Sequence, residues 1–246
     1  MDLLDLIYKN GGHIGGALSA LDIINTVYKC NLFNFDKDHF VLSAGHLATA
    51  LYVVLASLNK FPPKLLDTYS CFGSPLQGHI SAKVPGVEYS SGSLGQGLSF
   101  ACGLALGERN HHTICLTSDG EHQEGQIWEA AMFASKYKLN NLINIINVNG
   151  LQIDGTTDKI MPLGSLINKY TEFGWTTCEI DGHDPKAITT ALKNAQKSDK
   201  PICIIAKTIL GKGVSFMENN YKYHDVKGLS QELYEQASRE LKSINS

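Results

Sequence analysis

The sequence has no long apolar run, no internal repeat and no large excess of one charge, and each absence excludes a class of protein. No stretch approaches 18 consecutive apolar residues, so no membrane-spanning helix is expected. The 21 lysines and arginines are offset by 24 aspartates and glutamates, for a formal charge of −3. This balance argues against a nucleic-acid or membrane partner. Without a repeat, low-complexity tract or linker, we expect a single domain over residues 1–246.

The cysteines also lack a pattern, because no CxxC pair is present. The six are scattered, mostly among apolar neighbours, at Cys30, Cys71, Cys102, Cys115, Cys178 and Cys203. Such spacing fits buried, reduced thiols better than a disulfide framework or a zinc site. Residues 1–5 are acidic and lack the basic segment of a secretory signal. We therefore expect a cytoplasmic protein.

Short apolar runs alternate with helical patterns through most of the chain. Runs that predict buried strands occupy 40–43, 113–117, 142–148 and 202–206. Patterns that predict helices occupy 46–58, 98–107, 125–139, 186–197 and, as a polar terminal helix, 230–242. Strands without alternation, joined by helices, are typical of crossover units. The sequence thus predicts an α/β fold, a parallel β-sheet flanked by helices on both faces.

Two of the expected strands are followed by oxygen ligands. Asp119 comes after the strand ending at Thr117, and Asn149 after the strand ending at Val148. The 30 positions between them (149 − 119) suit a strand–helix–strand crossover, which places both side chains at one sheet edge. A carboxylate and an amide oxygen there can bind Mg²⁺, and Gly120 allows a phosphate to approach the backbone. Ordinary Asp-Gly and Asn-Gly turns are the alternative.

Glycines also surround other candidate residues. The segment 91–97 is glycine-rich and opens a helix, which fits close helix packing as well as a ligand loop. His13, His46 and His79 each follow a glycine, and no pair has the spacing of a helical zinc site. Loop imidazoles of this kind can bind phosphate or sugar hydroxyls and move protons. Four other histidines that we expect in loops have no such context: His39, His111, His112 and His122.

Taken in order, the motifs resemble the N-terminal, diphosphate-binding domain of transketolase over nearly the whole chain. The matching segments are GHIGG at 12–16, FVLSAGH at 40–46, GH at 78–79, PGVE at 85–88, GSLGQG at 92–97, DG at 119–120, QEG at 123–125, EA at 129–130, NGLQIDG at 149–155, TILGKG at 208–213 and His224. The departures are Ile14 for proline, Ser118 for glycine, and Asp225 for glycine. Asp225 adds a negative charge beside His224.

The resemblance implies a site for thiamin diphosphate and Mg²⁺, or Ca²⁺ or Mn²⁺ in its place. Asp119, Asn149 and the Leu151 carbonyl would hold the metal. The residues that would contact the cofactor are His46, Gly92, Leu94, Asp119, Gly120, Asn149, Leu151 and His224.

The resemblance also implies catalytic residues. His13, His79 and His224 would face the substrate and handle protons. Glu124 and Glu129 would belong to an acidic network at the interface between paired active sites. The implied activity is transfer of a two-carbon ketol unit from a ketose to an aldose, with or without a phosphate group on either sugar, in the pentose phosphate pathway.

Full-length transketolases continue into a pyrimidine-binding domain that supplies the activating glutamate, whereas this sequence ends after the closing segment. We therefore expect the N-terminal subunit of a split transketolase, paired with a C-terminal, pyrimidine-binding subunit in an assembly of two chains of each kind. One alternative is a half-subunit of another thiamin diphosphate enzyme, such as a sugar-phosphate synthase or a pathway-specific transketolase. The other is a non-catalytic, cofactor-binding partner.

Overall fold

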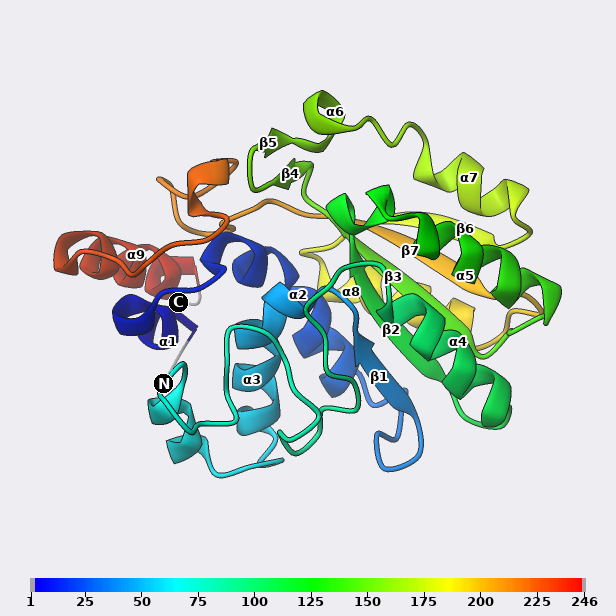
Figure 1. The fold of residues 1–246 in the computed structure, drawn as a ribbon, viewed down its shortest axis with the longest axis horizontal. Coiled ribbons are helices and arrows are strands. Elements are labelled where there is room, and N and C mark those ends of the chain that lie inside the picture. Colours follow the sequence, from blue (N-terminus) through cyan, green and yellow to red (C-terminus); the bar gives the residue numbers. More distant parts are fainter. Residues whose placement is uncertain (1–2, 245–246) are drawn as a thin grey trace.

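A five-stranded parallel sheet forms the centre of the computed structural model, which describes residues 3–244 (Figure 1). Its strands are β1 (His39–Leu42), β2 (Thr113–Ser118), β3 (Leu142–Val148), β6 (Thr176–Asp181) and β7 (Ile202–Lys207). Their order across the sheet is β1-β2-β3-β7-β6, and every neighbouring pair is parallel. The predicted α/β fold is confirmed.

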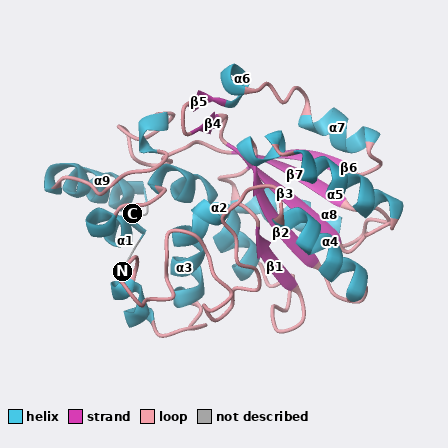
Figure 2. Cartoon of the chain, viewed as in Figure 1, coloured by secondary structure: helices cyan, strands magenta, loops and turns pink. Residues whose placement is uncertain are grey.

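Helices cover both faces of the sheet (Figure 2). On one face pack α4 (Gly97–Gly107), α5 (Gly125–Lys136) and α7 (Leu166–Glu172). On the other pack α2 (Ile14–Lys29) and α8 (Pro185–Ala195), with α1 (Leu3–Asn10) and α3 (Ala48–Ser57) against α2. The helix α9 (Gln231–Ile244) packs on α1. Short elements complete the chain: a hairpin of β4 (Leu151–Gln152) and β5 (Gly155–Thr156), α6 (Thr157–Ile160), and 3₁₀ turns at Gly45–Leu47, Pro63–Thr68, Gly120–Gln123 and Tyr221–Tyr223.

Burial of both sheet faces explains why the central strands show no alternation. Along β2, Leu116 belongs to the core under α2, and Cys115 to the core under α4 and α5. All six residues of β2 are buried. An apolar residue is therefore favoured at every position of such a strand.

Several elements differ from the sequence prediction. The edge strand β6 was not predicted, because its residues are only partly buried and their pattern is mixed. The helices α1 and α2 were not predicted either. All six thiols are free; Cys102, Cys115 and Cys203 are buried as expected, whereas Cys30 and Cys178 are half-buried and Cys71 is exposed. Within residues 3–244, no helix is long and apolar enough to cross a membrane.

Candidate functional site

The register of the central strands brings the predicted metal ligands to one sheet edge. Ser118 of β2 lies opposite Asn147 of β3, so Asp119 and Asn149 leave the sheet side by side. The Asp119 backbone N–H donates to the Asn147 carbonyl at 3.1 Å. This is the arrangement expected from their spacing in the sequence.

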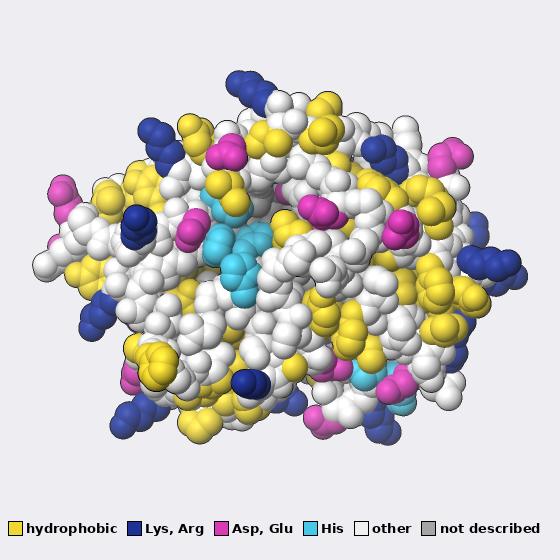
Figure 3. Space-filling view, viewed as in Figure 1, with side chains coloured by type: hydrophobic (Ala, Val, Ile, Leu, Met, Phe, Trp, Pro, Cys, Tyr) yellow, Lys and Arg dark blue, Asp and Glu magenta, His cyan; other side chains and the backbone are white. Residues whose placement is uncertain are grey.

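A cavity of about 360 Å³ opens at this edge. It is lined by every predicted site residue except Glu129: His13, His46, His79, Gly92, Leu94, Asp119, Gly120, Glu124, Asn149, Leu151 and His224. Ser118, Gln123, Gln152, Ile153 and Asp154 also line it and were not predicted. Figure 3 shows the imidazoles gathered beside a hollow near the middle of the viewed face. Another groove, of about 650 Å³ between β6 and α8, contains none of the predicted residues.

Asp119 is held in place by backbone amides. Its Oδ1 accepts from the Gly120 N–H at 2.9 Å, and its Oδ2 from the Gly150 N–H at 2.6 Å. The residue is 2% exposed, and burial raises the pKa of its carboxyl to about 6 in spite of these hydrogen bonds. A buried carboxylate whose charge is poorly compensated favours a cation beside it.

Asn149 and Leu151 add two more oxygen atoms that could bind a metal ion beside Asp119. The Asn149 Oδ1 accepts from the Leu151 N–H at 2.9 Å, and Leu151 opens the β4–β5 hairpin beside the cavity. Within the described residues, no cluster of three or more histidines, cysteines or acids is placed to hold a metal. One carboxylate, one amide and one backbone carbonyl suit a hard cation that takes its other ligands from phosphate and water. The donor set fits Mg²⁺.

Four imidazoles converge on the cavity from four separate segments. The His13 ring lies 5.5 Å from that of His46 and 5.6 Å from those of His79 and His224, between centroids. Burial lowers the pKa of His13 and His46, and lowers that of His224 to about 4, with the neighbouring imidazoles adding to the effect. The Nδ1 atoms of His13 and His224 are buried without a hydrogen-bond partner. Both are available to a ligand.

Backbone contacts bring two of these segments together. Gly12 and Val226 exchange N–H···O bonds of 2.8 and 3.0 Å, which places His13 next to the turn that carries His224. Because these residues are more than 200 positions apart, no local spacing could have paired them.

The glycine-rich segment both packs closely and lines the cavity. A Cβ on Gly97 would lie 2.4 Å from the Ser43 Oγ, so only glycine allows α4 to begin this close to the end of β1. Gly92 and Leu94, in the same segment, line the cavity. Close packing is confirmed, and the role of the segment as a ligand loop stays a prediction.

Glu121 is a structural residue of the site that sequence reasoning missed. Its buried carboxylate accepts from the Ser43 Oγ at 2.5 Å, the Gly95 N–H at 2.8 Å and the Ser118 N–H at 3.2 Å. It thereby joins the ends of β1 and β2 to the glycine-rich segment. Burial raises its pKa, against the effect of these donors. Its place two residues after Asp119 was the only signal in the sequence.

Two histidines without an expected role are also fixed by partners. His122 is fully buried: its Nδ1 bonds the Ser118 carbonyl at 2.7 Å, and its Nε2 the Tyr170 hydroxyl at 2.9 Å. His39 begins β1 and contacts two glutamates.

The two predicted acidic residues, Glu124 and Glu129, are both exposed. Only Glu124 lines the cavity.

Comparison with known proteins agrees with this geometry. The family model described as "Transketolase, thiamine diphosphate binding domain" matches residues 2–241. The chain belongs to the transketolase family. A solved transketolase from Campylobacter jejuni superimposes with a TM-score of 0.89 at 30% identity, over 96% of this chain. This chain spans 40% of the length of that transketolase.

Similar proteins of nearly the same length are named as subunits. The chain is 39% identical to an apulose-4-phosphate transketolase subunit of Phocaeicola vulgatus, over 97% of this chain and 89% of that protein. It is 41% identical to 6-deoxy-6-sulfo-D-fructose transketolase subunit SqwG of a Clostridium species, over 97% and 91%. Both names specify a sugar, so membership in the family does not define a general transketolase activity.

Proposed function

We propose that this chain is the diphosphate-binding subunit of a split transketolase, which transfers a two-carbon ketol unit from a ketose to an aldose once a partner subunit completes the site. The observation that carries the proposal is the convergence of four imidazoles with Asp119, Asn149 and Leu151 on one cavity. The near full-length similarity to proteins named as transketolase subunits supports it.

The charge of the cavity requires a cation for diphosphate binding. Asp119, Glu124 and Asp154 line it, and none of the described residues around it is a lysine or arginine. A diphosphate would therefore meet acidic side chains, neutral imidazoles and backbone amides. Mg²⁺ held by Asp119, Asn149 and the Leu151 carbonyl would supply the missing positive charge. Because the Gly120 N–H donates to Asp119, it would have to be shared with a phosphate oxygen.

The imidazoles suit the substrate side. At neutral pH, the lowered pKa values of His13, His46 and His224 keep these rings uncharged, so that each has one donor and one acceptor nitrogen. Such rings can orient the C1 and C2 oxygens of a ketose and take up or release a proton during transfer. Thiamin diphosphate, when bound, supplies the electron sink for breaking the bond between C2 and C3 of the ketose. The roles assigned to His79 and His224 belong to this proposal.

An apolar surface on α4 and α5 favours a protein partner. Large side chains that are exposed there are Phe100, Leu106, Met132 and Phe133, together with Tyr137 directly after α5. Figure 3 shows hydrophobic side chains gathered over these two helices. Contiguous apolar surface of this kind marks interaction sites. Glu129 lies on the same exposed side of α5, which fits the proposed acidic network between paired sites in an assembly of two chains of each kind.

A sugar-specific transketolase is the second candidate. Its support is that both relatives above are named for particular sugars, apulose 4-phosphate and 6-deoxy-6-sulfo-D-fructose. The non-catalytic alternative is disfavoured, because every proposed metal ligand and imidazole is present around the cavity. Cytoplasmic location and a place in the pentose phosphate pathway stay predictions.

The test is reconstitution with a pyrimidine-binding chain from the same organism. Ketol transfer would be measured with Mg²⁺ and thiamin diphosphate for each chain alone and for the mixture, with xylulose 5-phosphate and the two sugars above as donors. We expect activity only in the mixture, and none when Asp119→Ala replaces the native chain. Full activity from this chain by itself would overturn the split-subunit proposal. A mixed complex that forms but transfers nothing from any donor would favour the non-catalytic alternative.

A further inference from the structure

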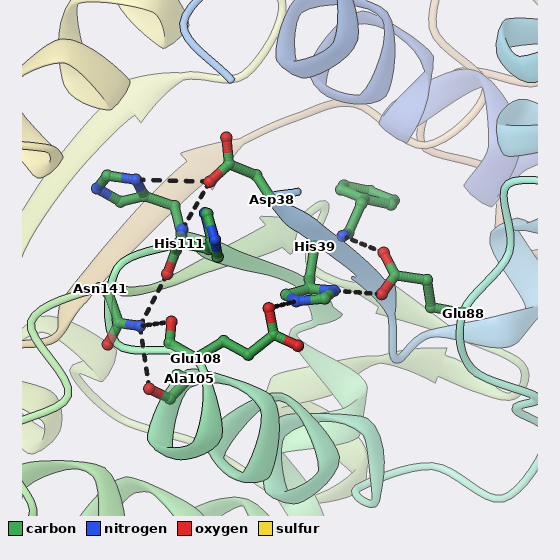
Figure 4. Close-up of polar contacts among 9 residues, drawn as sticks. Asp38, His39, Glu88, Ala105, Glu108, His111 and Asn141 are labelled. Carbon is green, nitrogen blue, oxygen red and sulfur yellow. Dashed lines mark hydrogen bonds and ion pairs between the residues drawn. The ribbon is translucent and has the colours of Figure 1, made fainter. Parts of the chain in front are cut away.

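His39 is the first residue of β1 and lies between two glutamates (Figure 4). The cavity is at the opposite, carboxyl ends of the strands, where Ser118 and Asp119 line it. Its Nδ1 bonds the Glu88 Oε2, and its Nε2 lies 3.3 Å from the Glu108 Oε2. The other oxygen of Glu88 accepts from the Phe40 N–H at 3.1 Å. The start of β1 therefore binds Glu88 twice, through backbone and side chain. The second contact, to Glu108, is an ion pair with poorer hydrogen-bond alignment.

The two glutamates delimit a continuous stretch of chain that reaches the cavity. Glu88 belongs to the long segment 69–96, which is without helix or strand and carries His79, Gly92 and Leu94. This segment leads directly into α4, and Glu108 caps the end of that helix. His39 thus ties the interior of this segment, at Glu88, and the end of α4, at Glu108, to the start of β1.

Two hydrogen bonds link the residues that follow Glu88 to the residues that follow His79. The Ser91 N–H donates to the Ile80 carbonyl at 3.2 Å, and the Ala82 N–H to the Ser90 Oγ at 2.9 Å. Residues 80–82 and 90–91 therefore lie alongside each other. A displacement of Glu88 would be passed to His79 through this pairing.

The protonation state of His39 decides whether both contacts can exist. A neutral imidazole has one N–H, whereas an imidazolium donates from both nitrogens and attracts both carboxylates. Burial of the ring by itself lowers the pKa of His39, but the hydrogen bonds and negative charges of Glu88 and Glu108 more than reverse this, and the pKa is raised. The three side chains are 15%, 35% and 50% exposed, for His39, Glu88 and Glu108 respectively.

Neighbouring groups do not compete for these carboxylates. Asp38 is engaged elsewhere, since its Oδ1 accepts from the His112 N–H at 2.7 Å and its Oδ2 from the Asn34 N–H at 2.7 Å. The His112 ring lies 3.8 Å from Asp38, and His111 is in the same turn. The Tyr28 phenol on α2 faces Glu88, and burial raises its pKa, so it stays neutral. Lys60, which lies against the loop at Gly86, pairs with Asp36.

We propose that His39 is a positioning residue: its imidazolium, bridging Glu88 and Glu108, fixes the segment that carries His79, Gly92 and Leu94 at the cavity. The consequence for ketol transfer rests on the function proposed above, whereas the effect on the segment does not. The bridge is complete below the ordinary imidazole pKa. It is lost as pH rises through the raised pKa of the folded chain, and the segment is then released.

Hydrogen exchange of the full chain tests the structural effect without any activity. Exchange rates in residues 79–96, corrected for intrinsic pH dependence, would be followed by mass spectrometry from pH 6 to 9. In the native chain we expect opening to increase by up to about tenfold per pH unit between the ordinary and the raised pKa, and then to level off. His39→Gln should exchange fast at every pH, and His39→Arg, which stays charged, should remain protected throughout.

His112→Gln is the matched control, because it removes another imidazole of the same sheet edge whose acidic partner is outside the segment. It should retain the native pH dependence.

In the reconstituted enzyme, kcat should fall at alkaline pH for the native chain and hold steady for His39→Arg. Identical exchange profiles in the native chain and His39→Gln would refute the proposal. If no ketol transfer is detected in any variant while the exchange results hold, the function fails and the role of His39 stands.

Discussion

Acidification should destabilise the fold through His122, and the structure gives the size of the effect. The ring is fully buried between the Ser118 carbonyl and the Tyr170 hydroxyl, directly under the turn of Asp119. Its Nδ1–H donates to Ser118, so its Nε2 must accept from Tyr170, whose oxygen accepts from the Asn144 amide at 3.1 Å. Only the neutral imidazole satisfies this network. Burial lowers the pKa of His122 from 6.5 to about 4.

The sign and magnitude follow from linkage. Because the unfolded chain binds the proton more tightly, the stabilisation from His122 is complete well above pH 6.5 and declines as pH falls toward 4. A pKa difference of about 2.5 units is worth about 3 kcal/mol at its limit, of which about 2 kcal/mol is lost between pH 7 and pH 5. The other imidazoles with lowered pKa values add to this loss.

Urea unfolding at pH 7, 6 and 5 would measure the effect in the native chain and in His122→Gln, with metal and cofactor absent. The variant should be less stable at pH 7, since it loses buried hydrogen bonds, but it should lose about 2 kcal/mol less than the native chain on acidification. Tyr170→Phe is the control, because it keeps the titrating ring and should retain the pH dependence. Parallel losses in the native chain and His122→Gln would refute this account of the network.

The proposed roles lead to three further predictions. Asp119→Ala and Asn149→Ala should each reduce Mg²⁺-dependent binding of thiamin diphosphate by tenfold or more in titration calorimetry of the assembled protein; unchanged affinity in both would contradict the metal site. His79→Ala should lower kcat more than cofactor affinity, and the reverse result in steady-state kinetics would remove it from the substrate side. Glu129→Ala should weaken assembly or the coupling of paired sites, as sedimentation and cofactor titration would show, whereas native behaviour in both would exclude it from the interface.

The part of the site on the central strands was predictable from the sequence. The apolar runs of β2 and β3 are continuous because both sheet faces are buried. Parallel strands joined by one helix must end at the same edge, so the interval between Asp119 and Asn149 was enough to place them together. Here a local pattern and a general rule of topology determine a contact between residues 30 positions apart (149 − 119).

Other features depend on contacts that no local pattern encodes. His39 meets Glu88 across 49 positions, and His122 meets Tyr170 across 48. Each looked like an isolated loop histidine because its partner lies on a different element. The edge strand β6 was missed for the opposite reason, since partial exposure removes the continuous apolar signal. The grouping of His13 with His224 came from resemblance to a family and not from spacing.

The residues that line the cavity differ in how firmly the fold holds them: Asp119 follows a central strand, whereas His79 lies in the segment 69–96. Asp119 extends a fully buried strand and is fixed by two backbone amides and the Asn147 carbonyl. His79 lies in a segment without helix or strand, where its carbonyl has a 3.4 Å contact with the Tyr52 hydroxyl. Loops tolerate substitution better than the strands that support them. Under the proposed function, we therefore expect the segment 69–96, which His39 anchors, to determine which sugar this chain accepts, and the strand that carries Asp119 to have little effect on that choice.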